Sequence, residues 1–229
     1  GGGWDTYPSR VDIHALRSLQ LGYRLPWPLQ MVVDEEALRQ YNAVHRFMLA
    51  VKRAKHELDR SPRVPASPLL HIQLSHFVAN LQQYCLDGIL LGATSAFKAR
   101  LAAANTLDAA REAHEAFLRA AADTCFLLNT PLSVSIAKRV YTILGLVLKY
   151  CRLCRELLQR GPHHRPRGAG PDALAERFQQ LARDFHGSHN FLLTVLTSQV
   201  RVTGRTHLKH LLMRLNFNEY YFPGGEEAA

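Results

Sequence analysis

The residues best suited to chemistry in this chain are four cysteines and twelve histidines. Cys151 and Cys154 are separated by two residues, and His163 and His164 follow them, so thiolate and imidazole groups that could bind Zn²⁺ lie close in sequence. Both cysteines, however, fall on the apolar stripe of a helical pattern. The histidines lie among prolines and glycines, with no second cysteine pair. These positions favour buried structural thiols over a metal site.

Catalytic arrangements are also poorly supported by the spacing of polar residues. Cys125 follows Asp123 closely, but no histidine stands at a spacing that indicates a nucleophile, a base and a third orienting group. The histidines are scattered, and none forms the pair with an intervening glutamate that metalloproteases use. The glycines are isolated or lie among prolines, so no phosphate-binding loop is present. We therefore expect no enzymatic activity and no cofactor or metal.

The charge of the chain favours an acidic partner. Lysines and arginines number 28 against 19 aspartates and glutamates, a net charge of +9. The partner could be nucleic acid, an anionic membrane or an acidic protein, and the total does not distinguish them. Aromatic residues are not interleaved with the basic clusters, and no recognition helix is evident. A basic helical domain that binds nucleic acid stays open as the alternative function.

Apolar periodicity predicts helices over most of the chain. Asp34 is expected to cap a first helix that ends before the proline-rich loop Ser61 to Pro68. The remaining helices are predicted at residues 70–84, 94–104, 105–128, 131–160, 171–204 and 206–215, with Gly88 and Gly92 interrupting the pattern between the first two of these. The fold class is all-α: an antiparallel bundle of about seven helices.

The first 33 residues are predicted to be an extended lead-in to this bundle. From Leu19 to Val33 apolar and polar residues alternate, which is typical of a strand with one buried face. Pro26 and Pro28 remove two N–H groups from the same edge, so the segment is predicted to be an edge strand or an extended clasp. It would lay Tyr23, Leu25, Trp27 and Leu29 across the bundle, and Trp27 is expected to be core.

The chain is predicted to fold as a single domain. Residues 161–171 read as a flexible linker inside one domain that spans residues 1–229, because the helices on either side each need a partner for their apolar stripe. The start at Gly1 without a methionine suggests a piece of a longer protein. No continuous apolar run approaches the roughly 18 residues of a membrane helix, and no signal peptide is visible. We therefore expect an intracellular protein.

Four stretches of the sequence together resemble the C-terminal half of the gamma-tubulin complex component family. They are the lead-in "LQLGYRLPWPL" from Leu19, the helix "YNAVHRFMLAVKRAKHEL" from Tyr41, the helix "HIQLSHFVANLQQY" from His71, and the end "HLKHLLMRLNFNEYY" from His207. The order and spacing cover nearly the whole chain. Departures include His45 in place of an aromatic residue and "CLDGILLGATSAF" after Tyr84. They indicate a divergent member of the family.

The resemblance implies a scaffold of the gamma-tubulin ring complex that helps to template microtubule nucleation. Its partners would be gamma-tubulin and, laterally, other gamma-tubulin complex components, with no nucleic acid and no membrane. It would lie in the cytoplasm on the cytoskeleton, at the centrosome or microtubule organizing centre and the spindle pole. No bond would be made or broken by this chain.

Gamma-tubulin contacts are expected at polar and basic residues off the apolar stripes, near the proline-rich loop and the chain end. The candidates are Arg46, Arg53, Arg63, His71, Lys209, Arg214, Asn218 and Tyr220. A solvated or locally structural role remains open for each of them. By contrast, Phe77, Leu81 and Phe217 are expected to lie in the core.

Overall fold

The computed structural model describes residues 19–65, 67–159, 171–203 and 206–216. Their elements in chain order are η2 (Leu29–Met31), α1 (Glu35–Asp59), α2 (Pro68–Leu86), η3 (Asp87–Ala93), α3 (Thr94–Ala103), α4 (Leu107–Thr124), α5 (Pro131–Gln159), α6 (Pro171–Thr203) and α7 (Thr206–Leu215). The described part contains no strand. The all-helical fold class is therefore confirmed.

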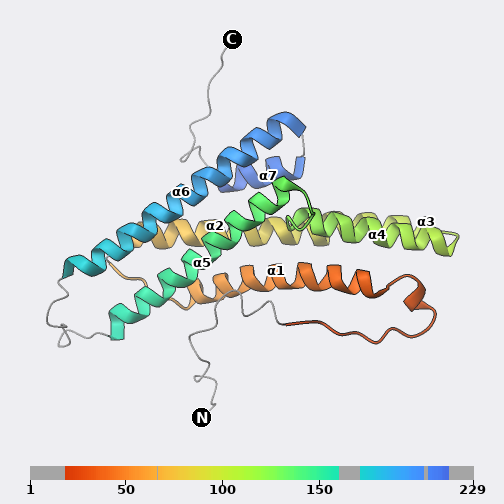
Figure 1. The fold of residues 1–229 in the computed structure, drawn as a ribbon, viewed down its shortest axis with the longest axis horizontal. Helices are drawn as coiled ribbons and strands as arrows, with labels where there is room; N and C mark the ends of the chain where they lie inside the picture. The colour runs from red at the N-terminus through yellow and green to blue at the C-terminus, as the bar shows by residue number, and fades with distance from the viewer. Residues whose placement is uncertain (1–18, 66, 160–170, 204–205, 217–229) are drawn as a thin grey trace, which may run out of the picture.

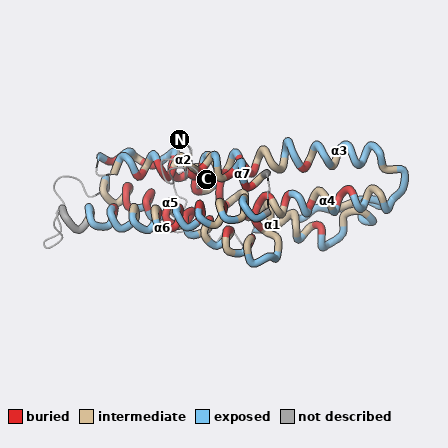
Figure 2. Tube along the Cα trace, turned by 90° about the horizontal axis from the view of Figure 1, so that it is seen from above, coloured by how far each residue is buried: buried red, intermediate tan, exposed pale blue. Residues whose placement is uncertain are grey.

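α1 to α4 lie along the long axis of the molecule, and α5 and α6 run obliquely to them (Figure 1). α1 packs against α2, α4 and α5, while α7 joins α2 to α6. Large side chains fill the centre of this arrangement: Phe47, Phe77, Tyr150 and Phe185 are at most 1% exposed. Figure 2 shows the buried residues gathered where these helices overlap, and the mainly exposed α3 extending beyond them. The core therefore lies at one end of an elongated molecule.

The starts of the helices agree with the sequence. Asp34 Oδ1 accepts a hydrogen bond from the Ala37 N–H at 2.8 Å and caps α1 as predicted. Thr106 caps α4 in the same way through the Ala109 N–H. Pro131 and Pro171 open α5 and α6, where the missing N–H of proline has no helical partner to lose.

The face predicted to be buried from apolar periodicity is buried in α2 and only partly buried in α1. In α2 the apolar residues at alternating spacings of four and three, which predict its inward face, are all buried: Leu70, Leu74, Phe77, Leu81 and Tyr84. In α1 the apolar period predicts a stripe of Leu38, Tyr41, Val44, Met48, Val51 and Leu58, of which only Val51 and Leu58 are fully buried. Phe47, Ala50 and Ala54 are buried beside them. The small Ala50 and Ala54 let neighbouring helices approach closely, which is why the inward face is wider than a stripe of large side chains suggests.

Gly88 and Gly92 do not separate two helices. The chain continues from α2 into α3 through the π-helical segment η3, which contains both glycines. A Cβ added at Gly88 would lie 2.7 Å from Thr124 Cγ2, so this position needs glycine because η3 passes so close to the end of α4. α4 ends at Thr124 and not near Leu128 as predicted, because Phe126 adopts a left-handed conformation with φ 58°.

The lead-in predicted to cross the bundle is not confirmed as a strand. Residues 19–26 have no regular structure, and η2 is a single 3₁₀ turn. The segment is tied to α1 because the Asn42 side chain accepts from the Leu21 N–H and donates to the Leu21 carbonyl. Trp27 is 81% exposed, so its assignment to the core was wrong. The two hydrogen bonds between Asn42 and Leu21, which the alternating pattern does not predict, hold the segment with most of its apolar side chains exposed.

Within the described ranges, α5 is the helix whose length and composition would allow it to cross a membrane. Residues Pro131–Leu158 are long and apolar enough to cross a bilayer, with a mean hydropathy of 1.4 over the best window. The sequence had suggested that no apolar run was long enough. The most apolar side chains of α5, including Val140, Ile143 and Val147, are fully buried, and the helix packs against α1 and α6. This is also the pattern of a core helix, so length and composition are weak grounds for a membrane span.

Candidate partner-binding surface

The cysteines lie in the helix packing and not on an accessible surface. All four are free and at most 1% exposed. Burial is the largest cause that raises the pKa of the Cys151 thiol, to about 12, and burial also raises the pKa of Cys154. A thiol with a raised pKa stays protonated and is a poor nucleophile or metal ligand. Among the described residues no group of three histidine, cysteine or acidic side chains could hold a metal, and His163 and His164 lie outside those residues.

Arg63 and His71 come together at the corner between α1 and α2. Arg63 is exposed in the connecting loop, and no ion pair is found for it in the described ranges. His71 is half-buried in the first turn of α2, with its ring 5.8 Å from that of Tyr150. Burial lowers the pKa of His71, and the charge of Arg63 lowers it further. The histidine is therefore held in its neutral form beside a free cation.

Arg53 is engaged in the structure of the bundle. Its Nη2 lies 2.9 Å from Glu57 Oε1, and Arg155 of α5 reaches Glu57 Oε2 at 2.6 Å. The Glu57 side chain is only 11% exposed. Arg53 therefore neutralises a buried carboxylate between α1 and α5, a local structural task. Arg46, two turns earlier on the helix, is half-buried and also makes an interaction.

Lys209 and Arg214 differ although both belong to α7. Lys209 is exposed, with no ion pair in the described part of the chain, whereas Arg214 Nη2 lies 2.7 Å from Asp87 Oδ2 of η3. The other end of α7 is fixed by His207, whose Nδ1 is 3.0 Å from the Tyr84 hydroxyl. Arg214 is therefore committed to holding α7 in place. Asn218 and Tyr220 lie outside the described residues.

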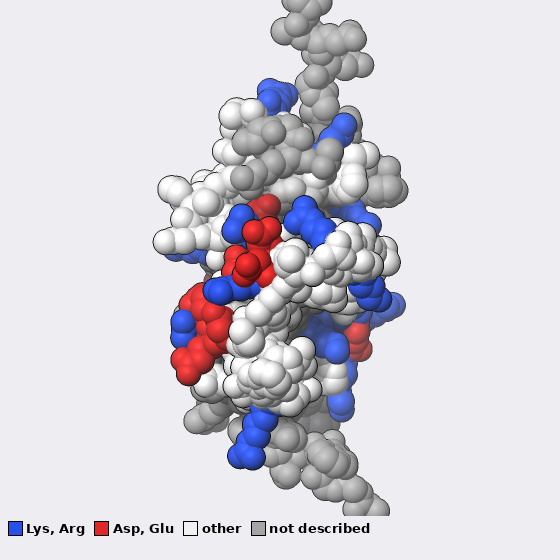
Figure 3. Space-filling model, turned by 90° about the vertical axis from the view of Figure 1, so that its right-hand side faces the viewer, with Lys and Arg blue, Asp and Glu red and all other residues white. Residues whose placement is uncertain are grey.

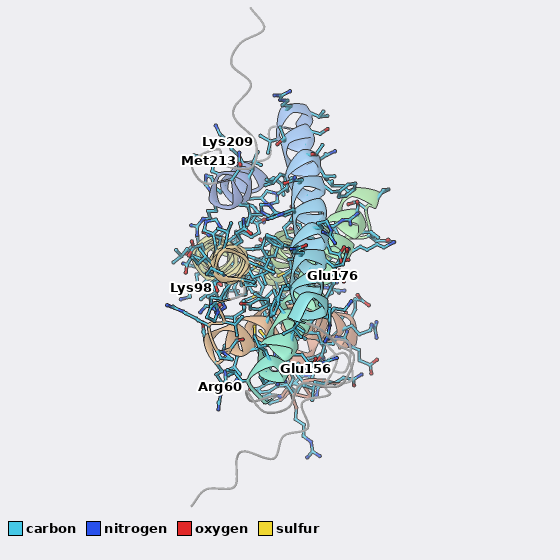
Figure 4. All side chains as sticks on the ribbon, turned by 90° about the vertical axis from the view of Figure 1, so that its left-hand side faces the viewer. Arg60, Lys98, Glu156, Glu176, Lys209 and Met213 are labelled. Carbon is cyan, nitrogen blue, oxygen red and sulfur yellow. The ribbon has the colours of Figure 1, made fainter. Side chains whose placement is uncertain are left out.

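Exposed apolar side chains lie next to these cations, and the sequence analysis missed them. Leu69 and Ile72 of α2 are 56% and 63% exposed, and Met213 of α7 is 62% exposed. Figure 4 shows Met213 and Lys209 side by side on α7, and Arg60 lower in the view at the end of α1. Leu69 and Ile72 fall off the stripe of Leu70, Leu74 and Phe77. That off-stripe position was the available signal.

We define the α1–α2–α7 face by six residues that combine positive charge and apolar area: Arg60, Arg63, Leu69, Ile72, Lys209 and Met213. α2 packs against both α1 and α7, so its exposed side lies between those helices. The three cations of this face make no ion pair in the described part of the chain, and Asp59, next to Arg60, pairs with Lys55. Leu69 and Ile72 follow the loop that carries Arg63, and Met213 lies beside Lys209 on α7 (Figure 4). Exposed apolar side chains near cations suit an acidic protein partner.

The opposite end of the molecule has a different character. Figure 3 shows acidic and basic side chains interleaved there. A cleft of about 520 Å³ between α1 and α4 is lined by charges of both signs, including Asp34, Glu36, Arg111, Glu115 and Arg119. Neighbouring opposite charges cancel at short range, so this cleft offers no comparable attraction for an acidic partner.

Comparison with known proteins gives matches over nearly the whole chain. Residues 5–221 match the family model described as the gamma tubulin complex component C-terminal. Human gamma-tubulin complex component 6 is 30% identical over 93% of this chain and 12% of its own length. Mouse component 5 is 28% identical over 92% of the chain and 23% of its own length. Human component 4 is 26% identical over 96% of the chain and 33% of its own length.

The chain thus spans a third or less of these curated relatives. Identities of 26–30% agree with the divergent member of the family that the sequence departures indicated, and component 6 is among these relatives.

Proposed function

This chain belongs to the gamma-tubulin complex component family, and on that premise we propose that it binds gamma-tubulin and helps to template microtubule nucleation. The observation that carries the proposal is the match of residues 5–221 to the family's C-terminal model. The relatives are components of a gamma-tubulin complex by name. Binding gamma-tubulin through this region is our inference for the present chain.

The α1–α2–α7 face is the proposed contact surface. Arg63 and Lys209 from the sequence-based set are exposed cations on it, and Leu69, Ile72 and Met213 add apolar area that a partner would bury. Apolar burial contributes roughly 25 cal/mol per Å², and the cations would attract an acidic tubulin surface and orient it. His71 lies at the edge of this face. For Arg46, Arg53 and Arg214 we favour structural roles, and Asn218 and Tyr220 stay proposals.

The proposed mechanism is positional and needs no catalysis. A scaffold that holds gamma-tubulins side by side places incoming tubulins next to neighbours already in position. This removes part of the translational and rotational entropy that free subunits lose on association. We infer that residues 1–229 act as one antiparallel helical domain. We also infer lateral contact with other components, location at the centrosome and spindle pole, and no role for a membrane or cofactor.

Binding to purified gamma-tubulin tests the proposal. We expect Arg63→Glu and Lys209→Glu each to weaken binding about tenfold at roughly 0.1 M salt, because reversing a cation changes attraction into repulsion. Lys138→Glu makes the same charge change on α5, outside the face, and should leave affinity within about twofold. Unchanged helical circular dichroism would show that each variant is folded.

The same experiment separates the alternative function. The family match gives no support to nucleic-acid binding, but the net charge of +9 makes the comparison necessary. A duplex DNA probe is therefore titrated at two salt concentrations. Tight DNA binding with a steep salt dependence, together with no gamma-tubulin binding, would replace our proposal with the alternative.

A further inference from the structure

Two clefts adjoin at the corner where α4 ends and α5 begins. One, of about 510 Å³, lies between α3 and α4, and the other, of about 580 Å³, lies between the α4–α5 connection and the first turns of α5. Leu128 lines both clefts. α4 leads to this corner along the long axis, and α5 leads away from it obliquely (Figure 1). We call the two clefts together the corner groove, and none of its lining residues belongs to the α1–α2–α7 face.

The walls of the corner groove are largely apolar. In the first cleft the rings of Phe97 and Phe117 pack with their centroids 5.3 Å apart, and Ala96 and Ala120 are exposed beside them. In the second cleft Val134 is 54% exposed. Clefts of this size can accept several side chains of a partner, whose apolar groups would leave water on binding.

The corner itself is anchored to the core. Phe126 follows the end of α4 in the left-handed region, with φ 58°, where glycine is usual. Its N–H donates to the Asp123 carbonyl at 3.0 Å, and the Leu127 N–H donates to the Ala122 carbonyl at 2.8 Å, which are the two bonds of a Schellman motif. The Phe126 ring is buried and stacks on Tyr84 at 5.9 Å. The turn therefore carries Leu127 off the helix axis and into the lining of the second cleft, so this part of the groove is formed before any partner binds.

The charge of the corner groove is positive. Its charged lining residues are three cations, Arg100, Arg119 and Lys138, and one carboxylate, Asp123. Asp123 Oδ2 lies 3.5 Å from Nε2 of His207 on α7, whereas the three cations form no ion pair among the described residues. The cations stand on α3, α4 and α5, so positive charge follows the groove from one cleft to the other.

The neighbouring cleft of about 520 Å³ between α1 and α4 also reaches Leu128, but its charge balance is the reverse. Three carboxylates, Asp34, Glu36 and Glu115, line it against two arginines. A negatively charged partner is therefore repelled from that cleft and attracted into the corner groove.

We propose that the corner groove binds an amphipathic helix of a partner protein, with its apolar side chains in the two clefts and its acidic side chains facing the three cations. A helix presents an apolar stripe at positions i, i+3, i+4 and i+7, and helical grooves are commonly filled in this way. The first cleft extends from Ala113 to Asp123 along α4, roughly 15 Å at 1.5 Å per residue. A helix of about 18 residues, roughly 27 Å long, spans it and enters the second cleft. This partner is additional to gamma-tubulin.

The probe is a synthetic peptide of about 18 residues, with leucines at helical spacings of three and four and glutamates between them. Its control has the same leucines and a lysine in place of every glutamate. We expect the whole chain to bind the acidic peptide at least about tenfold more tightly, and to lose affinity severalfold between roughly 0.05 and 0.3 M salt, because ions screen exposed charges. The amide NMR signals of Ala96, Ala120 and Leu128 should shift along the binding curve.

Matched variants test the groove. Ala120→Trp fills the first cleft and should weaken binding of the acidic peptide about tenfold, whereas Ala102→Trp, at an exposed position of α3 outside the groove, should change it less than about twofold. Lys138→Glu should weaken binding about fivefold. Lys98→Glu makes the same charge change at an exposed position outside the groove and should change binding less than about twofold. Ala96→Trp replaces Ala120→Trp if that variant does not fold.

Gamma-tubulin binding separates this inference from the proposed function. Ala120→Trp should bind gamma-tubulin as the wild type does, and Arg63→Glu should bind the acidic peptide within about twofold of the wild type. Loss of gamma-tubulin binding in Ala120→Trp would assign the groove to gamma-tubulin and overturn the proposal. A wild-type dimer that Ala120→Trp makes monomeric in sedimentation would overturn it by assigning the groove to a second copy of this chain. Equal affinity for the two peptides, or equal peptide binding by Ala120→Trp and Ala102→Trp, would also overturn it.

Discussion

Arg214 of α7 and Asp87 of η3 form an ion pair 2.7 Å long between positions 127 residues apart in the chain. Both side chains are about one-third exposed. At the other end of α7, the His207 imidazole lies against the Tyr84 hydroxyl. The helix is thus held by a polar contact at each end and by Leu208, Leu211 and Leu215 between them.

The first prediction concerns this ion pair. A double-mutant cycle with Arg214→Gln and Asp87→Asn, measured by urea unfolding, should give a coupling of about 0.5–1 kcal/mol, because solvent screens a partly exposed pair. The coupling should shrink in 1 M salt. Additive single-variant effects at low salt would show that the pair does not hold α7.

Glu57 should matter far more than an exposed glutamate. Its removal leaves Arg53 and Arg155 without their shared carboxylate, so Glu57→Gln should lower the free energy of unfolding by about 2–3 kcal/mol. Glu115→Gln breaks the exposed pair with Arg111 and should lower it by about 0–0.5 kcal/mol. Equal losses in chemical denaturation would contradict the role assigned to Arg53.

His189 should make stability fall at acidic pH. Burial, and then the charges of His76 and His186, lower its pKa from 6.5 to about 4. The unfolded chain therefore binds a proton at a higher pH than the folded chain. Stability is lost as pH falls below about 6.5, levels off below about 4, and the loss reaches at most about 3 kcal/mol.

Denaturant titrations from pH 7 to pH 4 measure this loss. His189→Gln should flatten the acidic slope, while His210→Gln, at an exposed position of α7, should leave it as in the wild type. A wild-type slope retained in His189→Gln would assign the acid sensitivity to other groups.

The two glycines of η3 should respond oppositely to alanine. Gly88→Ala brings a Cβ to 2.7 Å from Thr124 Cγ2 and should lower the free energy of unfolding by about 1–2 kcal/mol. Gly92→Ala meets no atom closer than 3.9 Å, so helix propensity should raise it by up to about 1 kcal/mol. Thr124→Ser removes the clashing methyl and should restore part of the Gly88→Ala loss. Without that restoration, the close approach would not be the cause.

Trp27 and Phe77 test the corrected position of the lead-in. Trp27→Ala should change the free energy of unfolding by less than about 0.5 kcal/mol, since the side chain is 81% exposed. Phe77→Ala should lower it by about 3–5 kcal/mol, since the ring is fully buried. A large loss for Trp27→Ala would restore its assignment to the core.

Local signals in the sequence were sufficient for most helices. Asp34 and Thr106 cap their helices through side-chain oxygens three residues from the amides they bind, and the period of α2 marked its buried face correctly. These features depend on neighbours in sequence, which a pattern records. The prediction for the lead-in was wrong because its position depends on a hydrogen bond to Asn42, which is 21 positions after Leu21.

The candidate site was only partly predictable for the same reason. Exposure of Arg63 and Lys209 follows from their place off the apolar stripes. Whether a cation is free depends on distant carboxylates: Asp87 engages Arg214 across 127 positions, and Arg155 joins Arg53 at Glu57 across 98. Spacing along one helix does not predict such distant partners. The sequence therefore could not distinguish an exposed arginine from one that forms an ion pair with another helix.

The exposed α3 gives the molecule a region that can open independently of the rest. It buries no residue of its own and packs against α4 and η3. Its opening free energy should be set by that one interface and not by the full core. Amide hydrogens of α3 should therefore exchange with solvent earlier than those of α2, although the two helices form a continuous rod. The turn between α3 and α4 is also where insertions and deletions should be tolerated best during evolution.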